Sequence, residues 1–415
     1  MPIARSSPLM LHRAVVFHIH GELPFEARML MEDFRLAVNS AIRAGLHAKV
    51  TSRNALTKLA YKDFRIEHPN MYAQHLVSSF EVAGSVLKNL RRRWGKGPIH
   101  RIPYVRRLMM KAENQAYKLD RENGVVDLPI RAGCHVKLRL VLSDYHRIFL
   151  NDKSLSLGSL TLLPDRVIIA FRKSAPRPYT PETALSLDTN ERSLDGVFLS
   201  KGGSTPVQAA FPDVAVIQAR HHNRRKRLQK TKAHDRRTSR RLCNKEGRRE
   251  RCRIEYRMHQ VANAVLSFAE EHRAAVVLED LNGMIGRKRG KSFNRRLSSW
   301  PRRKLHNIIE YKAAWNGVPV IKADPYNSSR RCPICGRIKH SRMGAEFDCE
   351  CGWRADRHVN AGINLLQTAF PEGMAGGLRF SPGAFQHDVM MILYDPEMGA
   401  RSEPNGTSQS MGRSL

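Results

Sequence analysis

Two cysteine pairs near the C-terminal end constrain this chain more than any other feature. The first is Cys332-Pro-Ile-Cys335, followed by Gly336, and the second is Cys349-Glu-Cys351, followed by Gly352. In such a knuckle the backbone turns so that both thiolates reach one metal ion, and glycine accommodates the turn. Two knuckles form a four-thiolate tetrahedral site with no position left open for chemistry. We therefore predict a structural zinc ribbon with ligands Cys332, Cys335, Cys349 and Cys351.

The second knuckle is one residue shorter than the usual Cys-x-x-Cys, so its geometry must differ from that of the first. Reduced free thiols or a weak metal site are the alternatives to a ribbon. The other three cysteines, Cys134, Cys243 and Cys252, have no partner at metal spacing and are predicted to be ordinary thiols. Four of seven cysteines within twenty residues favour metal ligation in a reducing compartment over a disulfide framework, so we expect a cytoplasmic protein.

The charge of the chain indicates a polyanionic partner. It carries 71 Lys and Arg against 38 Asp and Glu over 415 residues, a formal net charge of +33. Such an excess opposes compaction, and nucleic-acid binding is its usual reason, because lysine and arginine release counterions from phosphates. A generic basic surface or a membrane-surface protein is the alternative. No run of eighteen apolar residues and no leader-like N-terminal stretch is present, so we expect no membrane span and no signal peptide.

The basic residues gather in three segments. Arg91–Lys96 ends a helical pattern, Arg220–Arg257 is densely basic with few acids, and Gly286–Arg296 is a glycine-containing basic loop. A solvated helix usually mixes signs, so one-sided charge favours phosphate contact. Solvated surface is the alternative for each segment, and for the loop both interpretations stay open. The residues predicted to contact nucleic acid are Arg91, Arg92, Arg93, Arg224, Arg225, Arg227, Arg236, Arg237, Arg240 and Arg241.

The first half of the chain combines strand and helix patterns. His12–His20 is typical of a strand, and His18 and His20 on one of its faces are either solvated or a paired-histidine metal site. From about Pro24 to about Lys118 apolar residues recur at helical spacing, as at Leu30, Phe34, Val38 and Ile42. Strand patterns follow the Asn123-Gly124 turn. The proline-containing segment Lys173–Pro181 is predicted to be a linker between domains.

The second half begins with three short strands. They are Ala184–Asp188, Leu194–Ser200 and Thr205–Phe211, and the first ends in a carboxylate, as the sheet of an RNase H-like domain does. The basic segment then becomes amphipathic and leads to a buried strand, Ala274–Leu278, which ends at Glu279. Further predicted elements are a helix over Ser298–Trp315, a strand over Val318–Ile321 and a helix over Val359–Leu366. Beyond Leu366 the pattern decays, and residues from about Pro396 have a composition typical of disorder.

Three carboxylates lie where these elements begin or end: Asp188, Glu279 and Asp356. Any one of them is weak evidence, because such residues also cap helices. Three that meet in space would hold two divalent cations for phosphodiester hydrolysis, and Mg²⁺ suits oxygen ligands. The order of the three, with the ribbon before the third, makes the pattern specific.

These motifs resemble those of the TnpB (OrfB) family of transposon-encoded proteins, relatives of compact type V CRISPR effectors. The resemblance is strong from about Thr183 to Leu366 and rests before that on element order. The matching stretches are Leu187-Asp-Thr-Asn-Glu191, Val276-Val-Leu-Glu-Asp-Leu-Asn-Gly283, Leu297-Ser-Ser-Trp300, Ile309-Glu-Tyr-Lys312, the Cys332–Gly352 ribbon and Ala355-Asp-Arg-His-Val-Asn-Ala361.

The resemblance implies an α+β multidomain fold. An OB-like β wedge domain (1–23 and 119–180) would hold an inserted helical recognition domain (24–118). An RNase H-like (RuvC) nuclease (181–327 and 354–370) would be interrupted by the zinc ribbon (328–353) and followed by a partly disordered tail (371–415). It also implies a guide RNA and a target DNA as partners, structural Zn, catalytic Mg, and association with the nucleoid of a prokaryote. Monomer and homodimer both remain open.

One position departs from the family motif. The last motif usually reads Asp-Arg-Asp-x-Asn-Ala-Ala, and here His358 stands at the second Asp and Gly362 at the second Ala. Imidazole is a poorer Mg²⁺ ligand than carboxylate. Three interpretations follow: Asp356 takes over from a shifted site, which is our working hypothesis, His358 supports a weaker or differently metallated site, or the nuclease is impaired.

Four functions are therefore compared. An RNA-guided, Mg-dependent DNA endonuclease uses all the motifs. A guided DNA-binding protein without cleavage, acting as a repressor, is favoured by His358. A DNA-strand transferase would use His18 and His20, but no convincing Tyr or Ser nucleophile motif accompanies them. A plain zinc-ribbon nucleic-acid-binding module leaves Asp188 and Glu279 unexplained.

Overall fold

The structure is a computed structural model that describes residues 9–94, 102–281, 301–340, 344–374 and 377–393, without the side chains of residues 92–94. The chain divides into two compact units, Met1–Ala175 and Pro176–Leu415. The division lies inside the segment predicted as a linker. None of the described helices has the length and apolar composition needed to cross a membrane.

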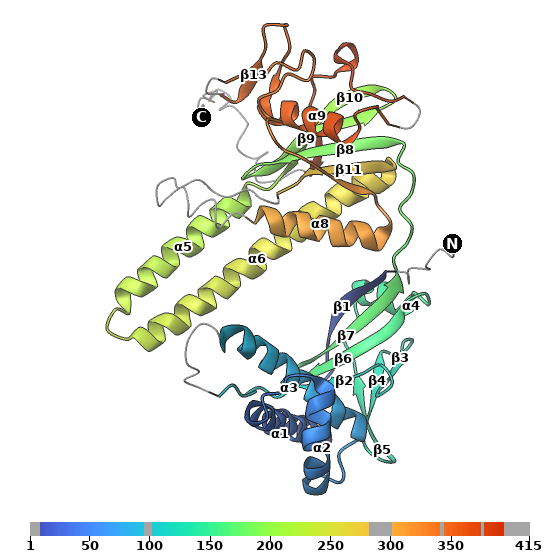
Figure 1. Cartoon of the computed structure of the whole chain (residues 1–415), viewed down its shortest axis with the longest axis vertical. Helices are drawn as coiled ribbons and strands as arrows, with labels where there is room; N and C mark the ends of the chain where they lie inside the picture. The colour runs from blue at the N-terminus through green and yellow to red at the C-terminus, as the bar shows by residue number, and fades with distance from the viewer. Residues whose placement is uncertain (1–8, 95–101, 282–300, 341–343, 375–376, 394–415) are drawn as a thin grey trace, which may run out of the picture. The chain divides into compact units, whose positions relative to one another are not determined.

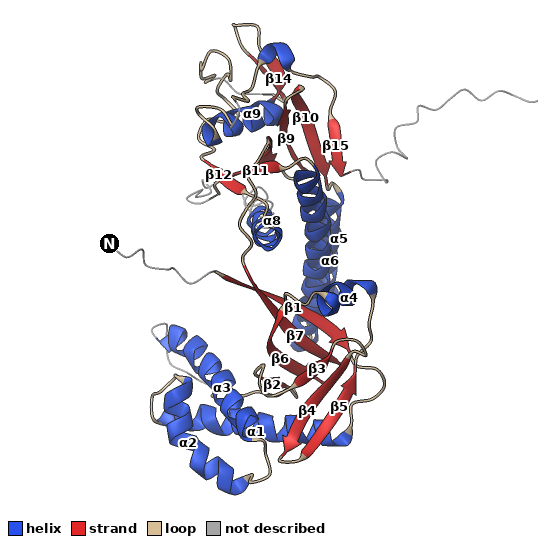
Figure 2. Ribbon diagram, turned by 90° about the vertical axis from the view of Figure 1, so that its right-hand side faces the viewer, coloured by secondary structure: helices blue, strands red, loops and turns tan. Residues whose placement is uncertain are grey.

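The first unit combines two antiparallel sheets with helices (Figure 1, Figure 2). One sheet has the strand order β1-β7-β6-β2 and the other has the order β3-β4-β5. In chain order the elements are β1 (Met10–His18), α1 (Phe25–His47), α2 (Arg53–Glu67), α3 (Ala73–Trp94), β2 (Met110–Ala112), β3 (Lys118–Asp120), β4 (Val125–Arg131), β5 (Cys134–Arg139), α4 (Asp144–Asn151), β6 (Ser156–Leu163) and β7 (Arg166–Ser174).

The helical periodicity predicted for this unit is confirmed over α1. Leu30, Phe34, Val38 and Ile42 lie on one face of the helix and are all buried. Removing such apolar surface from water stabilises the packed helices by about 1.5–3 kcal/mol for each large side chain. This packing accounts for why an apolar residue at every fourth position predicted the helix correctly.

The predicted extension of the helical pattern to Lys118 is wrong over the described residues 102–118, which contain no helix. Residues Met110–Ala112 form β2, which pairs with β6. Met110 and Ala112 are fully buried, whereas Lys111 between them is only partly buried, and this alternation is that of a strand. Helix α4 also lies within the stretch predicted as strands.

The second unit is built on a six-stranded sheet of order β12-β11-β8-β9-β10-β15. Strands β8, β9 and β10 are antiparallel neighbours, while β11 runs parallel to β8 and β12 parallel to β11. In chain order the elements are β8 (Thr183–Thr189), β9 (Ser193–Ser200), β10 (Gly203–Ala210), α5 (Asp213–Thr231), α6 (Arg236–Glu271), β11 (Ala274–Glu279), α8 (Arg302–Asn316), β12 (Val320–Ala323), β13 (Glu346–Asp348), β14 (Arg354–Asp356), α9 (Arg357–Ala369), η1 (Pro382–Ala384) and β15 (Met390–Leu393).

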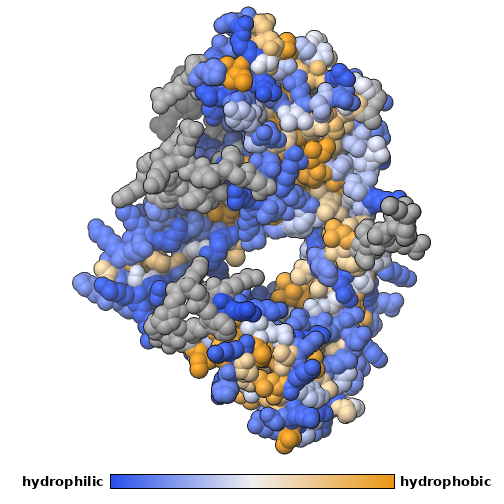
Figure 3. Space-filling model, viewed as in Figure 1, coloured by the Kyte–Doolittle hydropathy of each residue, from blue (hydrophilic) through white to orange (hydrophobic). Residues whose placement is uncertain are grey.

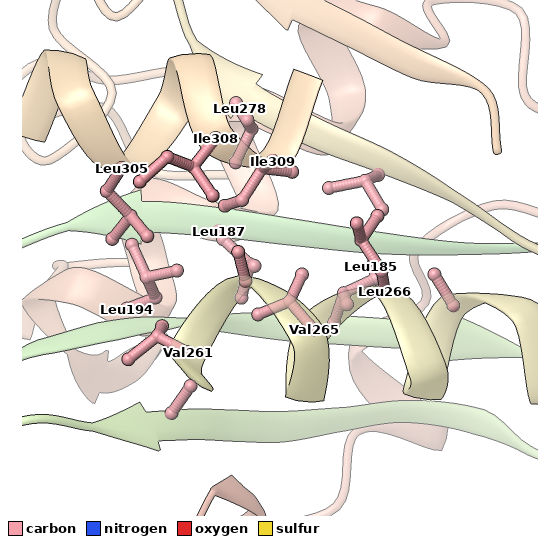
Figure 4. Close-up of a cluster of buried hydrophobic side chains, with 14 of the residues drawn as sticks. Leu185, Leu187, Leu194, Val261, Val265, Leu266, Leu278, Leu305, Ile308 and Ile309 are labelled. Atoms are coloured by element: carbon pink, nitrogen blue, oxygen red, sulfur yellow. The ribbon is translucent and has the colours of Figure 1, made fainter. Parts of the chain in front are cut away.

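The two faces of this sheet are covered by different helices. Leu185 and Leu187 of β8 point into a core with α6 and α8, where Figure 4 shows Val261, Val265 and Ile309 around them. The alternate residues Ala184, Ser186 and Asp188 face α9 and the ribbon. Because side chains alternate along a strand, the register of β8 sends its apolar residues to one helix layer and Asp188 to the other.

The basic segment Arg220–Arg257 lies in two helices. Helices α5 and α6 form a hairpin that extends away from the sheet (Figure 1). The break lies at Lys232–Asp235, where the Asp235 side chain caps α6 by accepting a hydrogen bond from the Thr238 backbone N–H at 2.9 Å. An N-cap of this kind satisfies a backbone donor that would otherwise have no partner.

The segment after α9 is more ordered than its sequence pattern predicted. Strand β15 adds to the sheet edge in parallel with β10. Before it, Phe380 and Phe385 pack against the ring of Trp353, with centroid distances of 5.6 and 5.2 Å. Aromatic residues spaced without a regular period therefore cover the core beneath the ribbon, which period-based interpretation of the sequence missed.

Candidate functional site

The four predicted zinc ligands lie together. One sulfur atom from each of Cys332, Cys335, Cys349 and Cys351 lies within 4.8 Å of the others, and two of the Sγ–Sγ distances are 3.5 Å. A tetrahedral site with Zn–S bonds of about 2.3 Å has S–S edges of about 3.8 Å, so these sulfurs are placed to bind one zinc ion. Among the residues that the structure describes, this is the one group of three or more His, Cys, Asp or Glu so close together.

Two different turns form the knuckles. In the first, the Gly336 backbone N–H donates to the Cys332 carbonyl at 3.0 Å, and Gly336 has a φ of +72°. In the shorter second knuckle, the Gly352 N–H donates to the Cys349 carbonyl at 2.9 Å, with a φ of +92°. Each glycine therefore takes the left-handed conformation that other residues rarely adopt.

The chemistry of the four thiols fits a cation. Burial raises the pKa of Cys332 to about 12, whereas a hydrogen bond from the backbone of Arg337, aided by the Cys349 thiol, lowers the pKa of Cys335 to about 7. All four would become thiolates together only if a positive charge lay among them. The donor set therefore suits a divalent, thiophilic ion.

Asp188 and Glu279 meet at one edge of the sheet. Strands β8 and β11 are parallel neighbours in which Leu187 pairs with Leu278, so the following residues, Asp188 and Glu279, lie side by side. Both carboxylates are buried, each with 8% of its surface exposed. The sheet register thus brings together two acidic residues that are ninety-one positions apart in the sequence.

The two carboxyl groups share a hydrogen bond and ionise unequally. Burial, together with the hydrogen bond to Asp188 and the charge of Asp188, raises the pKa of Glu279 to about 10. Burial alone would raise the pKa of Asp188, but hydrogen bonds from His358 and Glu279 lower it below its usual value. Glu279 is therefore protonated at neutral pH and donates to ionised Asp188. Two adjacent carboxyl groups that share a proton repel each other when both are ionised, and a bound cation would remove that repulsion.

The first turn of α9 presents His358 to this pair. The His358 Nδ1 atom lies 2.5 Å from the Asp188 carboxylate, and although burial opposes protonation, Asp188 raises the pKa of His358 above its usual value. Asp356 lies at the N-cap of α9, is exposed, and accepts hydrogen bonds through one oxygen from the backbone N–H groups of His358 and Val359. The role of Asp356 as a metal ligand stays a prediction.

Two further residues, Asp195 and His306, lie near the carboxylates and were missed by sequence analysis. Asp195 of β9 stands opposite Asp188 in the strand register, and its carboxylate accepts hydrogen bonds from Ser193 and Gln208 at 2.6 Å. Burial raises its pKa. His306 of α8 lies 2.7 Å from the Thr189 hydroxyl, and burial lowers its pKa to about 4, so it is neutral. Only the strand register and the packing of α8 reveal them.

The basic residues of the α5–α6 hairpin fall into two groups: those near its middle contact acidic side chains, and those near its tip pair with none that the structure describes. Near its middle, the buried His221 Nδ1 lies 2.8 Å from the Glu246 carboxylate, and Arg224 contacts the same carboxylate at 3.3 Å. Arg225 pairs with Glu250. Towards the tip the cations are exposed and form no ion pair with the described residues. Together with Asn244 they line one surface groove, here called the arm groove: Arg236, Arg237, Arg240, Arg241, Lys245 and Arg248.

The residues predicted to contact nucleic acid lie in different surroundings, and their role stays a prediction. Four of the predicted residues, Arg236, Arg237, Arg240 and Arg241, lie in the arm groove, whereas Arg224 and Arg225 are engaged by acids of α6. Arg227 and Arg91 are exposed. Figure 3 shows the hairpin surface in this view as mainly hydrophilic. The side chains of Arg92 and Arg93, the loop Gly286–Arg296 and the motif Leu297–Trp300 lie outside the described residues.

Sequence comparison connects the chain to known proteins. Residues 303–365 match the family described as Cas12f1-like, TNB domain. A TnpB-like protein of Methanocaldococcus jannaschii is 29% identical over 241 residues, which cover 56% of this chain and 86% of that protein. The CRISPR-associated endodeoxyribonuclease Cas12f1 of Sulfoacidibacillus thermotolerans is 35% identical over 111 residues, 26% of this chain and 25% of that protein.

Solved structures share the fold. The chain aligns with CasPhi-2 (Cas12j) bound to crRNA with a TM-score of 0.54 and 11% identity, covering 87% of this chain and 98% of that one. It aligns with Cas12f1 in a complex with sgRNA and target DNA with a TM-score of 0.50 and 15% identity, covering 81% of each chain. The architecture is therefore the mixed α/β, multidomain arrangement of these proteins. With the sequence relatives and the cysteine cluster, this similarity supports a protein of the TnpB family, related to the compact type V effectors.

Proposed function

We propose that this chain is an RNA-guided DNA endonuclease whose carboxylate site, formed by Asp188 and Glu279, holds divalent metal. The observation that carries the proposal is the contact between these two buried carboxyl groups at the ends of neighbouring parallel strands. A buried acidic pair has no role in the packing of a core, because burial of ionisable groups is costly. The activity in the name of the Cas12f1 relative, an endodeoxyribonuclease, supports the same reaction.

The chain's own residues would prepare the carboxylate site for metal. Two Mg²⁺ ions there would activate water and stabilise the leaving oxygen of a phosphodiester. Asp188 and Glu279 provide oxygen ligands, and the Thr189 backbone N–H donates to Glu279 and so helps to orient it. The first turn of α9 completes the site, either through Asp356 or through His358.

We also propose the finer domain assignment. The antiparallel order of β8, β9 and β10, followed by parallel β11 and β12, supports an RNase H-like (RuvC) nuclease in 181–327 and 354–370 with the ribbon at 328–353. The two antiparallel sheets of the first unit support an OB-like wedge that holds helices α1 to α3. A guide RNA and a target DNA are the proposed partners, and the arm groove is the proposed phosphate contact within the second unit.

A second candidate function is a guided DNA-binding protein with impaired cleavage. The observation that favours it is the direct contact between His358 and Asp188. An imidazole in that position occupies a carboxylate oxygen that a metal ion would use, and it is itself a weak ligand for Mg²⁺. Guided binding would then persist without hydrolysis.

The test uses protein co-expressed with RNA from its flanking sequence and a plasmid library with a matched target beside a randomised flank. We expect Mg-dependent cleavage by the wild type and none by Asp188→Ala or Glu279→Ala. Wild-type binding without cleavage would select the second candidate. Cleavage that survives both substitutions would reject the carboxylate site.

A further inference from the structure

Helix α9 has a row of amide side chains that hold the zinc ribbon. Asn360, Asn364 and Gln367 lie at intervals of four and three residues, which places them on one face of the helix. We call these three residues the amide row. All three donate hydrogen bonds to backbone carbonyls in the segment that leads into and through the first cysteine knuckle.

The contacts of the amide row are numerous. The Asn364 Nδ2 atom lies 2.8 Å from the carbonyls of both Ser328 and Arg331. The Asn360 Nδ2 atom lies 2.9 Å from the same Arg331 carbonyl. The Gln367 Nε2 atom lies 3.0 Å from the carbonyl of Pro333, which stands inside the knuckle between Cys332 and Cys335.

These contacts are buried and specific. Asn360 and Asn364 are 0% and 5% exposed, and Cys332 beside their acceptors is also buried. The Trp353 indole N–H donates to Oδ1 of the Asn360 side-chain amide at 3.1 Å, which fixes the orientation of that amide. Buried amide N–H donors are costly to leave without acceptors, so α9 packs favourably only where the carbonyls of the knuckle segment meet these donors.

The opposite side of α9 is fixed to the sheet. The Ser186 hydroxyl donates to the Gly362 carbonyl at 2.7 Å, and a Cβ at Gly362 would lie 2.7 Å from the Gly196 Cα of β9. At the start of the same helix, His358 contacts Asp188. Helix α9 is thus a single rigid element whose amide row binds the ribbon and whose first turn borders the carboxylate site.

We propose that Asn360, Asn364 and Gln367 are positioning residues through which metal loading of the ribbon fixes α9, and with it His358 and Asp356, against the carboxylate site. Only the consequence for cleavage rests on the proposed function; the mechanical coupling between ribbon and helix does not. Zinc ligation by Cys332 and Cys335 orders the knuckle whose carbonyls accept from the amide row. The ordered carbonyls then hold α9 in place.

Thermodynamic linkage makes the coupling measurable in both directions. If zinc stabilises the seated helix by some factor, the seated helix must strengthen zinc binding by the same factor. Asn364→Leu removes the amide donors at similar side-chain volume. Thr368→Val is the matched control, because among the described residues the Thr368 hydroxyl bonds to the carbonyl of Asn364, which lies within α9 itself.

The experiment measures two quantities on the full chain without RNA or DNA. The first is deuterium uptake of peptides from α9 and the end of β8, with Zn²⁺ bound and after its removal by a chelator. The second is Zn²⁺ affinity in competition with a chelating dye. In the wild type and Thr368→Val, we expect zinc removal to speed exchange in α9 by about 5- to 150-fold.

In Asn364→Leu, exchange in α9 should already be fast with zinc bound and should change less when zinc is removed. The zinc affinity of this variant should fall by the same factor by which its zinc-dependent change in exchange falls. Unchanged exchange of α9 after zinc removal from the wild type would overturn the proposal even if the variant failed to fold. An Asn364→Leu variant whose zinc affinity and α9 exchange both equal those of the wild type would overturn it as well. Because neither readout needs cleavage, a chain without nuclease activity can still pass this test.

Discussion

His358 and Asp356 are the two candidates for the third group of the carboxylate site. The imidazole of His358 contacts Asp188, while Asp356 two positions earlier caps α9. The two residues therefore differ in what their replacement removes: a neighbour of the carboxylates in one case, and a helix cap in the other. Suitable substitutions separate these roles.

We predict that Asp356→Asn abolishes cleavage while leaving thermal stability nearly unchanged. Asparagine caps a helix as well as aspartate does, so the free energy of unfolding should change by only a few tenths of a kcal/mol, whereas a metal ligand is lost. Melting temperature and cleavage rate, measured on the same preparation, check this. Full cleavage by Asp356→Asn would exclude Asp356 as a ligand and leave His358 as the third group.

We predict that His358→Asp raises the cleavage rate in Mg²⁺ by about tenfold or more, equivalent to about 1.4 kcal/mol of barrier. The reason is that a carboxylate is a better Mg²⁺ ligand than imidazole, and it removes the ion pair that engages Asp188. Single-turnover cleavage of a matched target is the measurement, with Asp188→Ala as the inactive control. A slower His358→Asp enzyme would show that imidazole is itself required.

His75 gives a pH prediction in the first unit. It is fully buried in α3, its Nε2 donates to the Pro129 carbonyl at 2.8 Å, and burial lowers its pKa to about 4. Since the unfolded chain binds a proton near pH 6.5 and the folded chain does not, stability falls as pH falls through this range. The loss should reach about 2 kcal/mol by pH 5.

The measurement for His75 is the local free energy of opening of α3, from native-state hydrogen exchange at about pH 7 and about pH 5. His75→Gln keeps a donor for Pro129 but cannot titrate, so it should lose correspondingly less stability. An equal pH dependence in both proteins would contradict the assignment.

At the scale of elements, the close approach of α9 to β9 explains a departure from the family motif. Gly362 stands where the motif has alanine, and an added Cβ would meet backbone atoms of Gly196 and Val197 at 2.7–3.3 Å. These are backbone atoms of a central strand, so they cannot move aside as a flexible side chain would. Glycine therefore permits the spacing between helix and sheet in this chain.

We predict that Gly362→Ala destabilises the second unit by about 1–3 kcal/mol, because overpacking outweighs the gain in helix propensity. Gly247→Ala in α6 is the matched control. An added Cβ there meets only the end of the Arg251 side chain at 4.0 Å, so up to about 1 kcal/mol of stabilisation is expected. Thermal denaturation distinguishes them, and stabilisation by both would refute the close-packing argument.

A separate prediction concerns RNA binding by the α5–α6 hairpin. Neutralising Arg237, Arg241 and Lys245 to Gln should weaken RNA binding and reduce the salt dependence of log K by about two to three units of slope, since each phosphate contact contributes about 0.7–0.9. These cations line the arm groove and form no ion pair with the described residues. Binding isotherms over a range of salt concentrations give the slope.

The control for the hairpin prediction removes the same number of charges from exposed positions of α2: Arg53, Lys58 and Lys62. If both triple variants change the slope equally, the effect belongs to net charge and not to the arm groove. Separate RNA and DNA probes show which nucleic acid the groove prefers.

The elements of the second unit could be predicted from the sequence because their patterns involve residues that are close together in the chain. The ribbon spacing, the short strands β8 to β10 and the acidic ends of β8 and β11 all depend on neighbouring residues, and each element lies where it was predicted. What was missed depends on register or packing. Asp195 joins the carboxylates only because β9 pairs with β8, and the break at Lys232–Asp235 interrupts an otherwise uniform basic pattern.

At the scale of the whole molecule, the two units differ in how far the sequence predicted them. The linker prediction falls at the observed division, but β2 in the first unit was predicted as helix, because a three-residue strand carries too short a pattern to detect. In the second unit, β15 returns to the edge of the sheet from a segment without clear periodicity. Long-range pairing of this kind leaves no trace in local sequence.

The most direct test of the central claim is guided cleavage of a matched plasmid in Mg²⁺ by the wild type, beside Asp188→Ala and Glu279→Ala. The account predicts cleavage by the wild type that needs both the RNA and the metal, and loss of cleavage in both variants with guided binding retained. Undiminished cleavage in either variant, or a wild type that binds its target and never cuts it, would contradict the claim that these two carboxylates form a working nuclease site.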